Sequence, residues 1–185
     1  MKKTDPRTIK TKKKLKDALK EEILEKDSYL DIKISDICNR AKVSRRTFYT
    51  HYKTIDDIIL EIQVEVTNDY MRRTKGINLV KDVRKNIETL FHFLDSDPFY
   101  ERLMFNPSHR FLMQALRKKS IAQINRDLSD LNKYDQFTKD AIMSFYNSAT
   151  YVIYQNWYQQ NKKEPIEKVI NIAANLVEKG FSFIL

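Results

Sequence analysis

The chain contains only two glycines and four prolines in 185 residues. Folds built from β-strands need frequent tight turns, and those turns depend on Gly, Pro and Asn. Their scarcity favours long helices joined by few connections. At this length the chain can also bury a sizeable core in one or two domains. We therefore predict an all-α protein of about nine helices.

The first helix is predicted to begin at Asp5–Pro6, because Asp5 can cap the helix and proline is favoured at the first helical position. Leu15, Leu19 and Ile23 follow at i,i+4 spacing, which is typical of one apolar helix face. Further stripes of the same kind predict helices over the rest of the chain, including one across residues 111–131.

Residues 34–53 are typical of two short helices around a tight turn. Ser35 is predicted to cap the first of them, and Ser44 the second. In the second helix Phe48 and Tyr52 are predicted to point inward. The polar and basic side chains left outside are Arg45, Arg46, Thr47, Tyr49 and His51. This is the layout of a helix-turn-helix whose second helix can lie in the major groove of DNA.

The positive charge of the chain is concentrated at its front. Residues 1–53 carry 16 Lys/Arg and 8 Asp/Glu, whereas residues 54–185 carry 18 Lys/Arg and 17 Asp/Glu. A basic cluster of this kind is expected of a surface that binds phosphates. The alternative is a lysine-rich terminus that only aids solubility, and the adjacent helix-turn-helix pattern argues against it.

Three segments follow from these patterns. Residues 1–53 are predicted to form a three-helix DNA-binding domain. Residues 54–76 are predicted to form a linking helix, which Thr54 and Asp57 start as a capping box. Residues 77–185 are then expected to form a helical regulatory and dimerisation domain.

Several classes of protein are disfavoured. The single cysteine, Cys38, cannot form an intramolecular disulfide and suggests a reducing compartment. No apolar run is long enough to span a membrane and no signal peptide is evident, so a cytoplasmic location is expected. His92 and His109 lack metal-ligand spacing. No nucleophile elbow, P-loop or dinucleotide motif is present, so we expect neither an enzyme nor a cofactor.

The front of the chain resembles the tetracycline-repressor-type (TetR/AcrR) family of bacterial transcriptional regulators. The resemblance is carried by residues 11–19, by Tyr29 and by the run from Ile34 to Lys53 with its Thr-Phe-Tyr-x-His-Tyr-Lys ending. Near the C-terminus, residues 151–181 look like the dimerisation end of one branch of that family. The family implies a homodimer, a ligand pocket in the C-terminal domain, and repression that a small ligand relieves.

Three positions depart from the family pattern. Lys42 stands where the turn usually has glycine, so a left-handed turn there would strain a side-chain-bearing residue. Ile55 stands where relatives often have a phosphate-contacting lysine, and Arg46 replaces a residue that is usually small.

Eight residues are our candidates for DNA contact. Arg45, Arg46 and Thr47 are expected nearest the base edges, because arginine and threonine can both read bases in the major groove. Tyr49, His51 and Lys53 are expected at phosphates, which position the protein without reading sequence. Lys12 is expected to add a contact to the DNA backbone, and Ser35 completes the set.

Dimerisation is expected because one short recognition helix reads only a few base pairs, whereas two read a palindromic operator. The last two helices offer apolar residues for this interface, and the candidates are Phe145, Ala149, Val152, Ala174, Val177 and Phe181. The alternative is that these residues form part of the core within one protomer.

A ligand pocket is the remaining expectation. An aromatic- and Met-rich set suits a flat or apolar ligand, and its members are Phe91, Phe99, Met104, Phe111, Tyr146 and Trp157. The alternative is that these side chains simply fill the core.

Together these patterns predict a dimeric DNA-binding regulator, a repressor whose operator binding responds to a small ligand. The alternative is a DNA-binding adaptor whose C-terminal domain binds a partner protein. A third reading, an enzyme with a basic arm, has no local motif to support it.

Overall fold

The computed structural model describes residues 5–78, 80–105 and 131–182. In these ranges the chain forms eight α-helices and one short 3-10 helix, and no strand. The prediction of an all-α protein is confirmed. Within the same ranges, no helix combines the length and apolar character that crossing a membrane requires.

The chain divides into two compact units, which we describe separately. The first unit draws its described residues from 1–69 and 97–118, and the second from 70–96 and 119–185. The helix that links them, α4 (Ile55–Arg73), begins in the first unit and ends in the second.

The first unit is a helical cluster built on α1 (Pro6–Glu25). Packed around α1 are the 3-10 helix η1 (Tyr29–Asp31), α2 (Ile34–Ala41), α3 (Arg45–His51), the front of α4, and α6 (Pro98–Phe105). As predicted, α1 begins at a cap in which Asp5 Oδ1 accepts the backbone N–H of Arg7 at 2.9 Å. Leu15, Leu19 and Ile23 are fully buried and form the centre of the core.

The position of α6 differs from the predicted domain boundary, because α6 belongs to the first unit. Phe99 and Leu103 pack into the core of the first unit, and α6 contacts α1. Arg102 strengthens this contact, since its guanidinium donates to the carbonyl of Lys26 at 2.8 Å and to the carboxylate of Asp27 at 3.1 Å. These residues follow the end of α1, where carbonyls lack helical partners.

The start of α4 is a capping box, as predicted. Thr54 Oγ1 accepts the N–H of Asp57 at 3.3 Å, and Asp57 Oδ2 accepts the N–H of Thr54 at 2.9 Å and that of Lys53 at 2.8 Å. Backbone donation from Thr54 and then from Lys53 lowers the pKa of the Asp57 carboxyl group. The two reciprocal bonds fix the direction in which α4 leaves α3.

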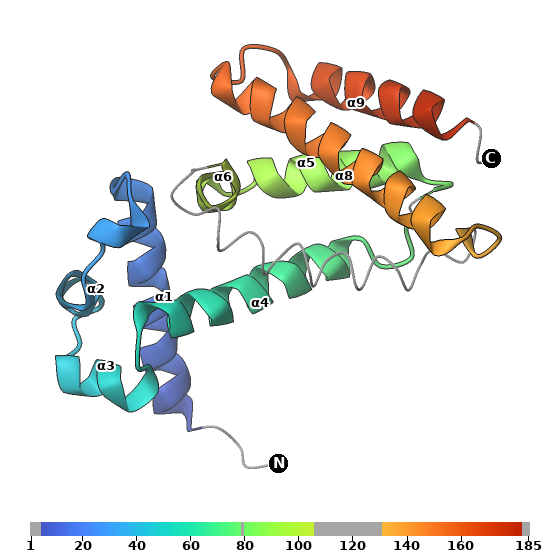
Figure 1. Cartoon of the computed structure of the whole chain (residues 1–185). Coiled ribbons are helices and arrows are strands. Elements are labelled where there is room, and N and C mark those ends of the chain that lie inside the picture. The colour runs from blue at the N-terminus through green and yellow to red at the C-terminus, as the bar shows by residue number, and fades with distance from the viewer. Residues whose placement is uncertain (1–4, 79, 106–130, 183–185) are drawn as a thin grey trace. The chain divides into compact units, whose positions relative to one another are not determined.

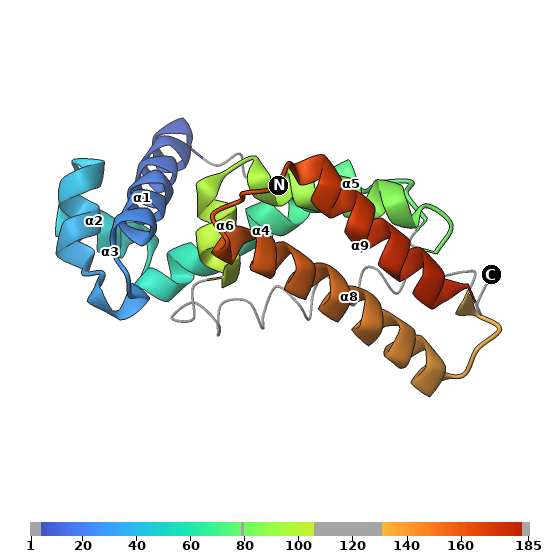
Figure 2. The same ribbon diagram turned by 90° about the horizontal axis from the view of Figure 1, so that it is seen from above.

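The second unit is formed by α5 (Val83–Asp95), α8 (Gln136–Gln159) and α9 (Ile166–Phe181). Helices α8 and α9 run side by side in opposite directions, and α9 also packs against α5 (Figures 1 and 2). Gly180 allows α9 its close approach to α8, because a Cβ atom there would lie 2.6 Å from the ring of Phe145.

Buried aromatic rings connect α5 with α8. Phe91 stands edge-on to Tyr154 with 5.0 Å between ring centroids, and Tyr154 stands edge-on to Trp157 at 5.3 Å. Trp157 donates its indole N–H to the carbonyl of Glu164 at 2.7 Å, which fastens the turn between α8 and α9. The two edge-on contacts have a geometry that aromatic pairs favour.

We expect the substitution Asp57→Asn to lower the midpoint of thermal unfolding at neutral pH. The lowered pKa means that the charged carboxylate stabilises the folded state. This contribution is fully present above the ordinary carboxyl pKa of 3.8 and is lost as the pH falls through the lower folded-state value. Thermal unfolding followed by circular dichroism should therefore show a difference near pH 7 that shrinks below about pH 3.

The matched control is Asp17→Asn, at an exposed position inside α1. It should leave the midpoint nearly unchanged at both pH values. If Asp57→Asn lowered the midpoint of thermal unfolding equally near pH 7 and below about pH 3, the charge of the capping carboxylate would contribute nothing to stability.

Candidate nucleic-acid interface

The turn between α2 and α3 is closed by two backbone hydrogen bonds. The N–H of Val43 donates to the carbonyl of Cys38 at 3.0 Å, and the N–H of Lys42 donates to the carbonyl of Asn39 at 3.2 Å. This is a Schellman motif, which requires a left-handed residue between the two helices. Lys42 supplies it with φ 53° and ψ 49°. Lys42 therefore takes the left-handed conformation considered above, which costs a side-chain-bearing residue roughly 1 kcal/mol relative to a right-handed one.

The start of α2 differs from the prediction. The N-cap is Lys33, two residues before the predicted Ser35. Asp36 reaches back to accept the N–H of Lys33 at 3.3 Å, so the helix begins earlier. The prediction that Ser35 caps α2 is wrong: Ser35 lies inside the first turn, half-buried, and donates to Asp36 Oδ1 at 3.3 Å.

The start of α3 agrees with the prediction. Ser44 Oγ accepts the backbone N–H of Thr47 at 3.0 Å and lies 2.8 Å from the hydroxyl oxygen of the same residue. This cap satisfies one of the free N–H groups of a short helix. Figure 1 shows α2 along its axis and α3 lying across the view, so the two helices point in clearly different directions.

Two aromatic side chains attach α3 to the rest of the first unit. Phe48 is fully buried, and Tyr52 is nearly so, as predicted. The Tyr52 hydroxyl donates to Glu61 Oε2 on α4 at 2.9 Å. Burial and the neighbouring Glu61 carboxylate raise the pKa of the Tyr52 phenol, so it stays a neutral donor.

The opposite face of α3 is open. Arg45, Arg46, Tyr49 and Lys53 are exposed, while Thr47 and His51 are half-buried. Across the described residues, no carboxylate pairs with Arg45, Arg46 or Lys53. Helical geometry turns Arg46 away from the buried positions 48 and 52. Arg45 lies three residues before Phe48, nearer the buried side, and is exposed in the first turn of α3. The result is a rigid helix face with two arginines.

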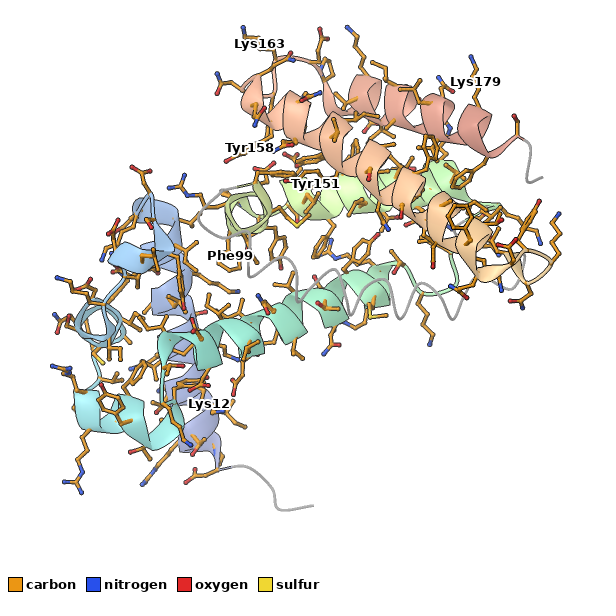
Figure 3. All side chains as sticks on the ribbon, viewed as in Figure 1. Lys12, Phe99, Tyr151, Tyr158, Lys163 and Lys179 are labelled. Atoms are coloured by element: carbon orange, nitrogen blue, oxygen red, sulfur yellow. The ribbon has the colours of Figure 1, made fainter. Side chains whose placement is uncertain are left out.

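Lys12, a predicted DNA contact, is partly buried and already has partners within the protein. Its ammonium pairs with Glu61 and lies 4.9 Å from the centroid of the Tyr52 ring. The neighbouring Lys16 pairs with Glu65 in the same way, so that α1 is fastened to α4. Figure 3 shows Lys12 on α1 close to the start of α4. Lys12 is therefore only partly available to a phosphate.

The acidic half of α1 is paired with a single arginine of α2. Arg40 binds Glu22 at 2.7 Å and Glu21 at 3.1 Å, and it also pairs with Glu25. The hydrogen bond from Arg40 lowers the pKa of the Glu25 carboxyl group. One guanidinium offsets the charge of these three carboxylates only in part, and Arg45 and Arg46 take no part in the pairing.

The residues predicted to line a pocket are divided between the two units. Phe99 and Met104 belong to the core of the first unit. Phe91, Tyr146 and Trp157 are buried in the second unit. Phe111 lies outside the described residues.

The predicted dimer surface needs correction. Ala174, Val177 and Phe181 are completely buried within the second unit, because they form the face of α9 that packs on α5 and α8. Phe145 and Val152 are exposed, with 44% and 47% of their surface accessible. Ala149 between them is half-buried.

Two exposed apolar residues of α9 were missed by the sequence analysis. Ile172 and Leu176 are 46% and 54% accessible. They lie one turn apart on the same side of α9 as Gly180, which touches Phe145. The outer side of the α8–α9 pair is thus apolar on both helices. The signal was present as an i,i+4 pair, but the stronger stripe through Ala173, Ala174 and Val177 obscured it.

Comparisons with protein-family models, with curated proteins and with solved structures gave no match to this chain. In the described ranges no three His, Cys, Asp or Glu side chains gather as a metal ion would require.

Replacing Phe48 by Ala should lower the free energy of unfolding by about 3–5 kcal/mol, because it removes a fully buried ring and leaves a cavity. Urea unfolding followed by circular dichroism measures the loss. Tyr49 is the adjacent control, since its ring is 51% exposed. Tyr49→Ala should change the free energy by only about 0.5 kcal/mol, and equal losses for both variants would contradict the assigned orientation of α3.

Proposed function

We propose that the chain is a dimeric DNA-binding regulator of transcription, which represses by occupying an operator. The observation that supports this most is the open face of α3, where Arg45 and Arg46 have no carboxylate partner among the described residues. The excess positive charge of residues 1–53 supports the same proposal. So does the resemblance of this segment to tetracycline-repressor-type regulators.

In this proposal α3 enters the major groove, and its residues divide by role. Arg45 and Arg46 reach base edges, where a guanidinium can bind guanine through two hydrogen bonds. Thr47 contributes its methyl group more than its hydroxyl, which is already close to Ser44. Tyr49, His51 and Lys53 contact phosphates and fix the register of the helix on DNA.

The proposed dimer forms through the outer side of the α8–α9 pair. Phe145, Ala149 and Val152 from α8 and Ile172 and Leu176 from α9 supply its apolar centre. Exposed apolar side chains on two adjacent helices are typical of a protein interface. A two-fold axis through this surface would present two copies of α3 to two half-sites.

Ligand response is assigned to the second unit. The Tyr146 hydroxyl is buried there without a hydrogen-bond partner in the described residues, and a polar atom of a bound ligand would satisfy it. Helix α5 of this unit continues through Ser96 and Asp97 into α6, which packs on α1. A ligand that shifts α5 would thus act on the DNA-binding unit through α6.

The alternative function, an adaptor that binds another protein, shares the DNA-binding unit. The exposed apolar residues of α8 and α9 also fit a different partner chain. The oligomeric state separates the two proposals, because an adaptor that uses this surface for a partner would be monomeric alone.

Two substitutions test the division of roles on DNA. Fluorescence anisotropy is measured on labelled duplexes of about 30 base pairs, long enough for two half-sites. Lys53→Ala should weaken binding to every sequence alike and make the dependence of log K on log salt shallower. Arg45→Ala should instead cost about 1–3 kcal/mol on a selected sequence and less on a random one.

Lys163→Ala is the control, because Lys163 lies exposed at the turn between α8 and α9 and points away from α5 (Figure 3). It removes the same charge from the second unit and should leave DNA binding unchanged. If Lys53→Ala alters sequence preference with the salt dependence intact, the proposed division of roles is wrong.

The dimer is tested by Leu176→Lys, which places a charge at the centre of the proposed interface. Sedimentation equilibrium at micromolar concentration should show a dimer for the wild-type chain and a monomer for the variant, because a buried unpaired charge is costly. Leu30→Lys is the control, since Leu30 is 84% exposed on the first unit, and this variant should remain dimeric. A monomeric wild-type chain would favour the adaptor.

A further inference from the structure

Two lysines of the described chain adopt the left-handed backbone conformation. Lys42, between α2 and α3, has φ 53°, and Lys162, after α8, also has φ 53°. Side-chain-bearing residues avoid this region because the Cβ atom crowds the backbone, and strained residues persist where other interactions compensate them. The surroundings of the two lysines can therefore be compared directly.

Lys162 is compensated within the protein. Its ammonium binds Asp95 of α5 at 2.6 Å and lies 5.4 Å from the centroid of the Trp157 ring. Its N–H donates to the carbonyl of Trp157 at 3.0 Å. The side chain thus contributes contacts that glycine could not make.

At Lys42 only backbone hydrogen bonds offset the strain of the left-handed conformation. The Schellman hydrogen bonds through its N–H and that of Val43 form equally well with glycine. Its side chain is exposed, and across the described residues its ammonium has no carboxylate, carbonyl or aromatic partner. The protein itself therefore gives no reason for lysine at a position that glycine would fill without strain.

Lys42 lies next to the candidate DNA-binding face. It immediately precedes Val43 and the cap of α3, and Arg45 and Arg46 follow in the first turn of that helix. We propose that the Lys42 ammonium binds a backbone phosphate of double-stranded DNA beside the groove that α3 enters. This inference rests on the proposed function. It adds a charge-assisted contact that positions the turn and contributes affinity without reading sequence.

The experiment compares Lys42→Gly and Lys42→Arg with the wild-type chain, using anisotropy on a labelled duplex of random sequence of about 30 base pairs. Lys42→Gly should bind about 10-fold more weakly near 0.1 M salt, and its salt slope should be shallower by about one per bound protomer. Its thermal midpoint should not fall, because glycine relieves the backbone strain. Lys42→Arg keeps the charge and should retain wild-type affinity.

Lys162→Gly is the matched control, since it removes a lysine from the same backbone conformation in the second unit. It should bind DNA like the wild type. If Lys42→Gly keeps full affinity while Arg45→Ala weakens binding, the inference about Lys42 is overturned and the proposed function survives. If the wild-type chain binds no duplex, both are overturned.

Discussion

The burial of Phe48 is the interaction on which the candidate interface depends. Helix α3 has seven residues and would not persist in isolation, because so few hydrogen bonds cannot offset the cost of helix nucleation. Its stability comes from the Phe48 ring, which is fully enclosed in the core of the first unit. Once this side chain is inside, helical geometry turns Arg46 away from the core. Arg45 is exposed in the first turn of α3, and Tyr49 is 51% exposed. Core packing thus fixes the orientation of α3, and with it the exposure of Arg46.

Most ion pairs of the first unit leave out the arginines of α3. Acidic residues of α1 lie mostly in its second half, where Arg40 pairs with Glu21, Glu22 and Glu25. Other carboxylates bind the lysines that join α1 to α4. The arginines of α3 are outside both networks. Their field is therefore compensated less by nearby acids, which is the condition for attracting a polyanion.

Local sequence patterns predicted much of the secondary structure. They failed where the position of a helix depends on contacts between residues far apart in the sequence. Periodicity and capping residues located α1, α3 and the start of α4, because caps are formed by residues close in sequence. Ser35 was misassigned because two plausible caps competed and Asp36 reached back to Lys33. The assignment of α6 to the first unit depends on Phe99 packing against residues far away in sequence, which no local pattern reveals. On α9 both an inner and an outer stripe are apolar, so the pattern alone could not identify which one includes Leu176.

We propose that the first unit binds duplex DNA through charged side chains on and around α3. The most direct test measures the affinity of the purified wild-type chain for double-stranded DNA over a series of salt concentrations. We expect measurable binding, with a logarithm of the association constant that falls steeply and linearly with the logarithm of the salt concentration, because counterions are released from phosphates. Absence of binding at low salt, or an affinity that does not change with salt, would contradict it.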